Sequence, residues 1–75
     1  MVFETVKNVI VETVNCEEAL VTMEAGLKDT LGLDSLDAVE VSMALEEEFA
    51  ITIAEDAMGK FVTVGDIVAY IEGLQ

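Results

Sequence analysis

The chain has 75 residues, of which 53% are hydrophobic, and sixteen acidic residues against three lysines give it a formal net charge of -13. This length allows a single domain, residues 1–75, and leaves no room for a second. The charge excludes nucleic acid as a partner, because phosphates would be repelled, and it favours partners with basic surfaces.

The first predicted helix covers residues 2–14. Its apolar residues recur at three- and four-residue steps: Phe3, Val6, Ile10 and Val14. Such a stripe is typical of the side of a helix that faces a core. Asn15 is the predicted stop.

A long connection is predicted for residues 16–34. Gly26 and Gly32 interrupt it, and Val21, Leu27 and Leu31 are expected to turn toward the core. A connection of this length is uncommon in a compact domain and is usually functional. We expect it to position the residues that follow and to cover the core.

The second predicted helix covers residues 35–49 and has the strongest signals, because good helix formers dominate it and no Gly or Pro interrupts it. Its apolar residues recur mostly at three- and four-residue steps: Leu36, Val39, Met43 and Phe49. Asp34 or Ser35 can act as its N-cap, and Asp37 adds a favourable negative charge in the first turn.

Two short segments follow the second helix. Residues 50–54 are predicted as an extended loop, because a single strand would have no partner. Residues 55–60 are predicted as a short third helix of about one and a half turns.

The last predicted helix has Thr63 as its N-cap. Asp66 follows three residues later, which is the spacing of a capping box with Asp in place of Glu. The helix is expected to run to about residue 72 and to end at Gly73. Its buried residues are expected to be Val64, Ile67, Val68 and Ile71. Three main helices and one short helix predict a small all-α, four-helix bundle with a long loop between the first two helices.

Ser35 stands at the junction of turn and helix, where a serine has two interpretations. It is ordinarily a capping residue whose oxygen accepts a hydrogen bond from an amide one turn on. The chain has no His and its only Cys is remote in sequence, so no base is present to make Ser35 a nucleophile of the triad kind. The alternative is an attachment point that another enzyme modifies. A phosphodiester on its oxygen would lie against helix N–H groups, which suit an anion.

The residues around Ser35 also carry a family resemblance. Gly-Leu-Asp-Ser-Leu at 32–36, followed by Asp-Ala-Val-Glu and then Met-Ala-Leu-Glu-Glu-Glu-Phe, resembles the acyl carrier proteins, close to the bacterial fatty-acid type. The resemblance extends over essentially the whole chain and implies the same small helical fold. It also implies a non-catalytic carrier, in which Ser35 bears 4'-phosphopantetheine donated from coenzyme A by a phosphopantetheinyl transferase. The thiol of that arm would hold acyl groups as thioesters and present them to fatty-acid synthesis enzymes.

The resemblance also implies a cavity and a docking surface. In that family the acyl chain folds back between the helices, at positions that would equally serve as ordinary core residues: Val6, Leu27, Leu45, Phe49, Ile53, Met58, Phe61, Ile67 and Ile71. The family's partner enzymes dock the second helix on basic patches. The matching surface combines acidic and apolar side chains: Asp34, Leu36, Asp37, Glu40, Met43, Glu46 and Glu47. Charge pairs of this kind speed encounter, fix orientation and are weakened by salt.

Three positions depart from the usual family pattern. Thr30 replaces an Asp and Ala54 replaces a Pro, and both changes are expected to loosen the local structure. Gly59 replaces an acidic residue, which puts partner contacts at the short helix in doubt but not the modification of Ser35.

Other classes of small acidic protein are less consistent with the sequence. Residues 29–40 begin and end like a calcium-binding EF-hand loop, but Leu31 and Leu33 occupy positions that need oxygen ligands, and Asp34 takes the place of the turn glycine. A non-carrier acidic adaptor would leave the Gly-Leu-Asp-Ser-Leu context unexplained. A carrier for a polyketide or another specialised acyl pathway would look much the same as a fatty-acid carrier.

The high hydrophobic fraction raises the question of a membrane. No run approaches the roughly 18 consecutive apolar residues of a spanning helix, and the N-terminus lacks the basic start of a secretory signal.

Cys16 has no partner for an internal disulfide, and no Cys/His cluster is present for zinc. We expect a reduced, monomeric, cytoplasmic protein with no metal site and no membrane insertion.

Overall fold

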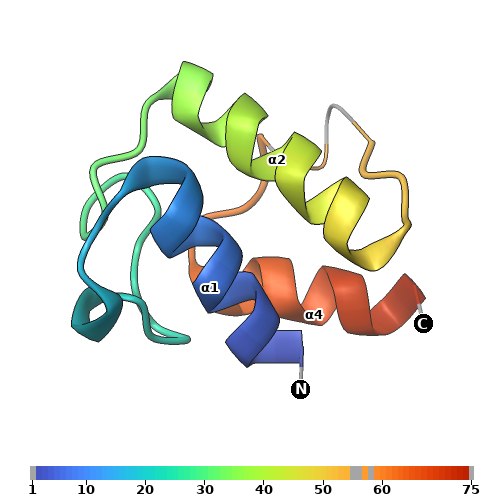
Figure 1. The fold of residues 1–75 in the computed structure, drawn as a ribbon, viewed down its shortest axis with the longest axis horizontal. Coiled ribbons are helices and arrows are strands. Elements are labelled where there is room, and N and C mark those ends of the chain that lie inside the picture. Colours follow the sequence, from blue (N-terminus) through green and yellow to red (C-terminus); the bar gives the residue numbers. More distant parts are fainter. Residues whose placement is uncertain (1, 55–56, 58, 75) are drawn as a thin grey trace.

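The computed structural model describes residues 2–54, 57 and 59–74. In these ranges it has three α-helices and one 3-10 helix: α1 (Val2–Val14), η1 (Glu18–Leu20), α2 (Ser35–Phe49) and α4 (Val64–Leu74) (Figure 1). The bounds of the first two predicted helices are confirmed. The predicted short helix at 55–60 includes residues that lie outside the described ranges. None of the helices in the described ranges is long and apolar enough to cross a membrane.

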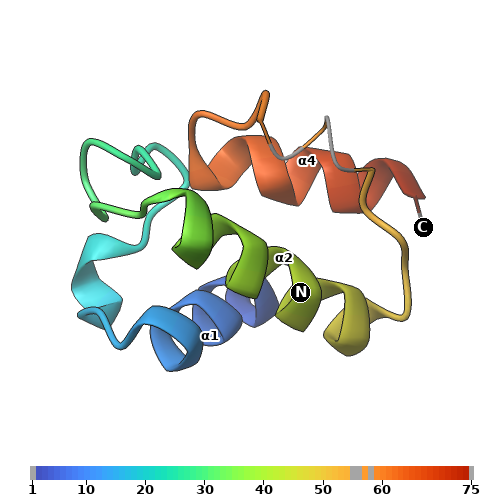
Figure 2. The same ribbon diagram turned by 90° about the horizontal axis from the view of Figure 1, so that it is seen from above.

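The helices are arranged around α1. It packs against α2, α4 and η1, whereas the backbones of α2 and α4 stay further apart from each other (Figure 2). The predicted stripe of α1 faces the core, with Val6 and Ile10 fully buried and Phe3 and Val14 half-buried. Every buried side chain in the described ranges is apolar, and together they form one core: Val6, Val9, Ile10, Val21, Ala25, Leu27, Leu33, Val41, Leu45, Ile53, Val64, Ile67, Val68 and Ile71.

The apolar repeat that predicts α2 does not mark the face that this helix buries. Leu36, Val39 and Met43 are 66%, 55% and 61% exposed, while Val41 is fully buried. At about 100° per residue, the three exposed residues lie roughly 140–160° around the helix from Val41. Of the repeat, Phe49 alone packs against the core. α2 therefore has two apolar faces, and one of them is open to solvent.

Left-handed backbone ends two of the helices. Asn15 follows α1 with φ = 55°, which confirms the predicted stop, and Ala50 caps α2 with φ = 54°. The predicted stop at Gly73 is wrong, because α4 continues to Leu74. Gly73 has no positive φ, and a glycine ends a helix by adopting that conformation.

The connection between α1 and α2 is anchored by its apolar side chains and by a turn at Gly26. Val21 and Leu27 are buried as predicted, whereas Leu31 is half-buried. The Thr30 hydroxyl accepts a hydrogen bond from the Gly26 N–H at 3.0 Å. The Thr30 side chain therefore closes the turn, and the expectation that it loosens this segment relative to an Asp stays a prediction.

An isolated antiparallel bridge joins the connection to the start of α4, at Gly26 and Thr63. Beside it, the Leu27 N–H donates to the Val62 carbonyl at 2.8 Å. Two segments that are distant in sequence are thus fixed side by side.

Thr63 and Asp66 form the capping box that the sequence predicts. The Thr63 hydroxyl accepts the Asp66 N–H at 3.2 Å, and the Asp66 carboxylate accepts the N–H groups of Val62 and Thr63 at 2.9 and 3.1 Å. The Val62 and then the Thr63 backbone donors hold the pKa of Asp66 below its usual value. The cap therefore fixes the same segment as the bridge.

Candidate functional site

Ser35 is the first residue of α2, and the cap of that helix is its neighbour Asp34. The Asp34 carboxylate accepts the Asp37 N–H at 2.8 Å, and the Asp37 carboxylate accepts the Asp34 N–H at 3.4 Å. Of the two candidates for the N-cap, the structure therefore selects Asp34. Ser35 is exposed, and its hydroxyl makes no hydrogen bond to any described residue. This hydroxyl is accessible for chemistry.

The turn before Ser35 is shaped by Gly32 and by a backbone hydrogen bond. Gly32 has φ = 67°, a conformation that favours glycine, and the next residue, Leu33, is buried. The Leu33 N–H donates to the Leu27 carbonyl at 2.9 Å. This bond closes the loop 27–33 and leaves Ser35, two residues further on, at the surface.

Ser35 lies at the rim of a pocket of about 450 Å³. The rim is polar, because the four polar or charged residues that line it are all exposed: Lys28, Asp29, Asp34 and Ser35. The wall is apolar and comes from α2, α4 and the segments before them: Leu27, Leu33, Ala38, Val39, Val41, Phe61, Val62 and Ile67. The backbones of α2 and α4 do not contact each other, and the pocket between these segments leaves space for a small apolar ligand.

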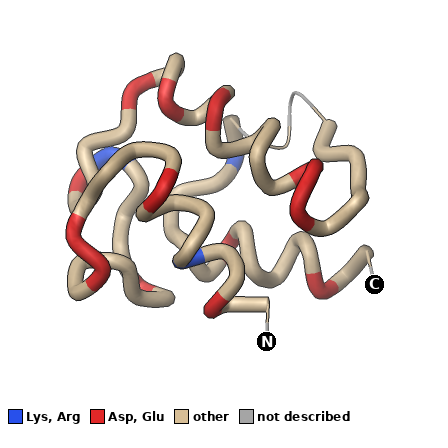
Figure 3. Tube along the Cα trace, viewed as in Figure 1, with Lys and Arg blue, Asp and Glu red and all other residues tan. Residues whose placement is uncertain are grey.

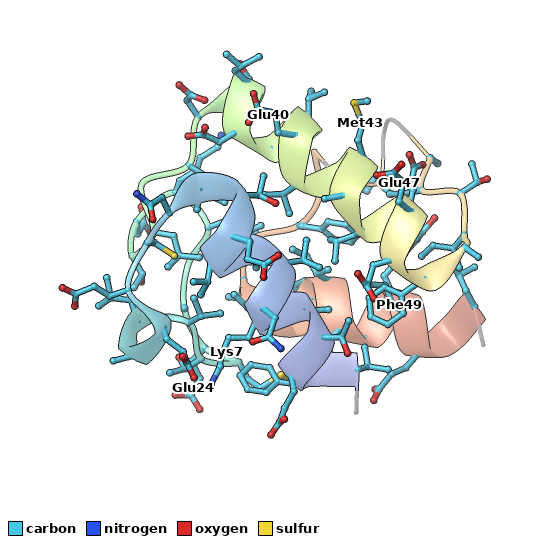
Figure 4. All side chains as sticks on the ribbon, viewed as in Figure 1. Lys7, Glu24, Glu40, Met43, Glu47 and Phe49 are labelled. Carbon is cyan, nitrogen blue, oxygen red and sulfur yellow. The ribbon has the colours of Figure 1, made fainter. Side chains whose placement is uncertain are left out.

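The nine residues predicted for an acyl cavity do not all line this pocket. Leu27, Phe61 and Ile67 line the pocket. Four others belong to the buried core without lining the pocket: Val6, Leu45, Ile53 and Ile71. Phe49 is half-buried and points from the end of α2 toward α4 (Figure 4). Met58 lies outside the described residues.

Sequence reasoning misses several residues of the pocket. Ala38 and Val39 stand three and four residues after Ser35, so helical spacing alone places them on its side of α2. That signal is present in the sequence. Leu33 and Val62 reach the pocket through the turn and the bridge, which no local pattern specifies.

The seven residues predicted for partner binding fall into two groups. Four are exposed along α2, where Figure 4 labels three of them: Leu36, Glu40, Met43 and Glu47. The other three accept hydrogen bonds from the backbone: Asp34 and Asp37 in the cap, and Glu46. The half-buried Glu46 carboxylate accepts the Ile53 N–H at 2.7 Å. Acidic residues are spread over α1, α2 and the connection, and the lysines are few (Figure 3).

The residues around Ser35 fit a phosphodiester. The first turn of α2 presents N–H groups and the positive end of the helix dipole. Lys28 adds a cation to the rim, and the apolar wall suits a hydrocarbon chain. Among the residues with described positions, no cluster of side chains could hold a metal ion.

Three comparisons with known proteins agree with one another. The family model described as "Phosphopantetheine attachment site" matches residues 4–71. The acyl carrier protein of Helicobacter acinonychis (strain Sheeba) is 51% identical over 70 residues, which cover 93% of this chain and 90% of that protein. A solved structure of a candidate acyl carrier protein from Mycobacterium tuberculosis matches with a TM-score of 0.92 and 27% identity, over 100% of both chains. All three likenesses span most of the chain rather than a single motif.

Proposed function

The chain belongs to the acyl carrier protein family, whose members bear phosphopantetheine and are carriers rather than catalysts, and from this premise we propose that Ser35 is its attachment residue. One observation carries the proposal. The Ser35 hydroxyl is exposed, makes no hydrogen bond to a described residue, and stands between a helix N-terminus and the rim of an apolar pocket. A serine used for capping would instead be engaged with the backbone of its own helix.

Attachment needs a second enzyme, because the chain has no histidine to activate the serine. The Ser35 oxygen forms a bond to the pantetheine-bearing phosphorus of coenzyme A, adenosine bisphosphate departs, and the transferase takes up the serine proton. Asp34 assists by capping α2 in place of Ser35, which leaves the serine oxygen available. Once bound, the arm supplies a terminal thiol that holds acyl groups as thioesters.

The proposed cargo is a fatty acyl chain. The pocket wall offers Leu27, Phe61 and Ile67 to a hydrocarbon, and each CH₂ that leaves water contributes about 0.8 kcal/mol. The deeper core residues of the predicted cavity, such as Leu45 and Ile71, would be reached only after α2 and α4 move apart.

The proposed partners are the transferase and fatty-acid synthesis enzymes with basic docking patches. Glu40 and Glu47 would pair with basic side chains, and Leu36 and Met43 would make the apolar contacts, since all four are exposed. Glu46 would contribute less, because its carboxylate is already bonded to Ile53. We expect a monomeric, single-domain carrier that works in the cytoplasm.

The test is the intact mass of the protein before and after incubation with coenzyme A, Mg²⁺ and a phosphopantetheinyl transferase. The parent is expected to gain one phosphopantetheine, and Ser35→Ala is expected to gain none. Ser42→Ala is the matched control, because Ser42 is the only other serine of the chain and also lies in α2. That variant should be modified like the parent.

Two results would contradict the proposal. A folded, initially unmodified parent that gains no mass while a known carrier does would favour an acidic adaptor. A loaded carrier that polyketide enzymes accept and fatty-acid elongation enzymes refuse would reassign the protein to a specialised acyl pathway.

A further inference from the structure

Lys28 is the one cation among the described residues that line the pocket. The other charged residues of the rim are Asp29 and Asp34. Lys28 forms no ion pair with any residue in the described ranges, whereas Lys7 pairs with Glu18 at 3.1 Å. The exposed Lys28 ammonium is therefore available to a ligand that enters the pocket.

The backbone before Lys28 is bonded to the turn that leads to Ser35. The preceding residue, Leu27, uses both of its backbone groups, since its N–H donates to Val62 at 2.8 Å and its carbonyl accepts the Leu33 N–H at 2.9 Å. Leu33 stands two residues before Ser35. These bonds fix the backbone next to Lys28, and Lys28 and Ser35 line the same pocket.

The acidic side chains beside Ser35 would repel a phosphodiester, although the N-terminus of α2 would favour it. The carboxylates of Asp34 and Asp37 flank Ser35 at the start of α2, and the whole chain carries a charge of -13. A further negative charge is disfavoured by its like neighbours and favoured by a nearby cation. Lys28 is the lining residue that can supply this compensation.

We propose that Lys28 is a positioning residue for the phosphopantetheine arm. Its ammonium pairs with the phosphodiester on Ser35 and orients the arm along the mouth of the pocket. This inference rests on the proposed attachment at Ser35. The bond would be charge-assisted, and salt would weaken it because the pair is exposed.

The test compares the unmodified and the loaded forms of four proteins: the parent, Lys28→Gln, Lys28→Arg and Lys60→Gln. Lys60→Gln is the matched control, because it removes the same charge from an exposed lysine that does not line the pocket. Excess transferase and coenzyme A drive loading to completion, which intact mass verifies. The readouts are the ³¹P resonance of the arm and the melting temperature of both forms at low salt.

Loading is expected to raise the melting temperature of the parent by about 1–8 °C more than that of Lys28→Gln, the range expected of one exposed ion pair in a domain of this size. Lys28→Gln is also expected to shift the ³¹P resonance, while Lys28→Arg and Lys60→Gln keep the parent's value. High salt should remove these differences.

Each contrary result has a distinct meaning. If the fully loaded Lys28→Gln and Lys60→Gln proteins show the same ³¹P resonance and the same gain in melting temperature, the role of Lys28 is overturned. The attachment at Ser35 would remain intact. A parent that accepts no arm would overturn both.

Discussion

Asp66 is a single carboxylate that helps to hold the two sides of the pocket together. It accepts the N–H groups of Val62 and Thr63, and the Val62 carbonyl in turn accepts the Leu27 N–H from the other side. Both Val62 and Leu27 line the pocket. These backbone donors, Val62 first, favour the ionised carboxylate and lower its pKa.

Asp66→Asn is expected to lower the melting temperature at neutral pH and to lose this effect in acid. The pKa of Asp66 in the folded protein lies below its ordinary value of 3.8, so the unfolded chain takes up the proton first as the pH falls. The stabilisation is fully present above that ordinary value and disappears as the pH falls through the lowered folded pKa. Circular dichroism melts of both proteins, from about pH 7 down to about pH 2, measure it.

Glu72→Gln is the control for this experiment. Glu72 is an exposed acid in the same helix, and its side chain makes no hydrogen bond to a described residue. The difference in melting temperature between Glu72→Gln and the parent should not follow the pH profile of Asp66→Asn. If the difference in melting temperature between Asp66→Asn and the parent stays constant into strong acid, this result would contradict the role of the ionised carboxylate.

Single residues differ in how much of their role the sequence reveals. Capping signals are local, so Thr63, Asp66 and the stop at Asn15 are predictable from neighbouring residues alone. Glu46 and Glu47 are not distinguishable in this way, because both are acids in the same turn of α2. They differ because the chain after α2 returns and brings the Ile53 N–H to one of them.

α4 contains two glycines in opposite environments. Gly65 lies in the first turn, where its N–H donates to the Met23 carbonyl at 2.8 Å. A Cβ at this position would stand 2.8 Å from the same carbonyl oxygen, whereas a Cβ at Gly73 would meet no atom within 4 Å. The close approach at Gly65 attaches the connection to α4.

Gly65→Ala is expected to lower the free energy of unfolding by about 1–3 kcal/mol, because a backbone oxygen blocks the added methyl group. Gly73→Ala should instead raise it by up to about 1 kcal/mol, because alanine favours a helix over glycine. Urea denaturation of both variants measures the two effects. A gain in stability from Gly65→Ala would contradict the close packing against Met23.

The three main helices are predictable because propensity, caps and periodicity agree along each of them. Periodicity identifies α2 as a helix but misassigns its faces, since the apolar residues at Leu36, Val39 and Met43 outnumber the buried pair Val41 and Leu45. Only packing against α1 decides which apolar face is buried. The same reason explains why the residues that line the pocket could be predicted only in part.

Charge acts on the molecule as a whole. The chain has sixteen acidic residues and three lysines. The acidic residues are distributed over all the labelled helices (Figure 3). The backbone of the described residues extends over about 27 × 25 × 19 Å. Folding therefore brings many like charges closer together than they are in the unfolded chain, and this repulsion lowers the stability of the folded state.

Added salt is therefore expected to raise the melting temperature. At about 0.01 M salt the Debye length is about 30 Å, so every pair of charges in a molecule of this size interacts, whereas at about 0.15 M it is about 8 Å and only neighbours do. Calorimetric melts at these two concentrations measure the change. Sodium chloride and choline chloride should act alike if general screening is the cause. The Lys7–Glu18 ion pair is too weak to reverse the sign of the change. A melting temperature that does not change between the two concentrations would show that self-repulsion does not limit the stability of this fold.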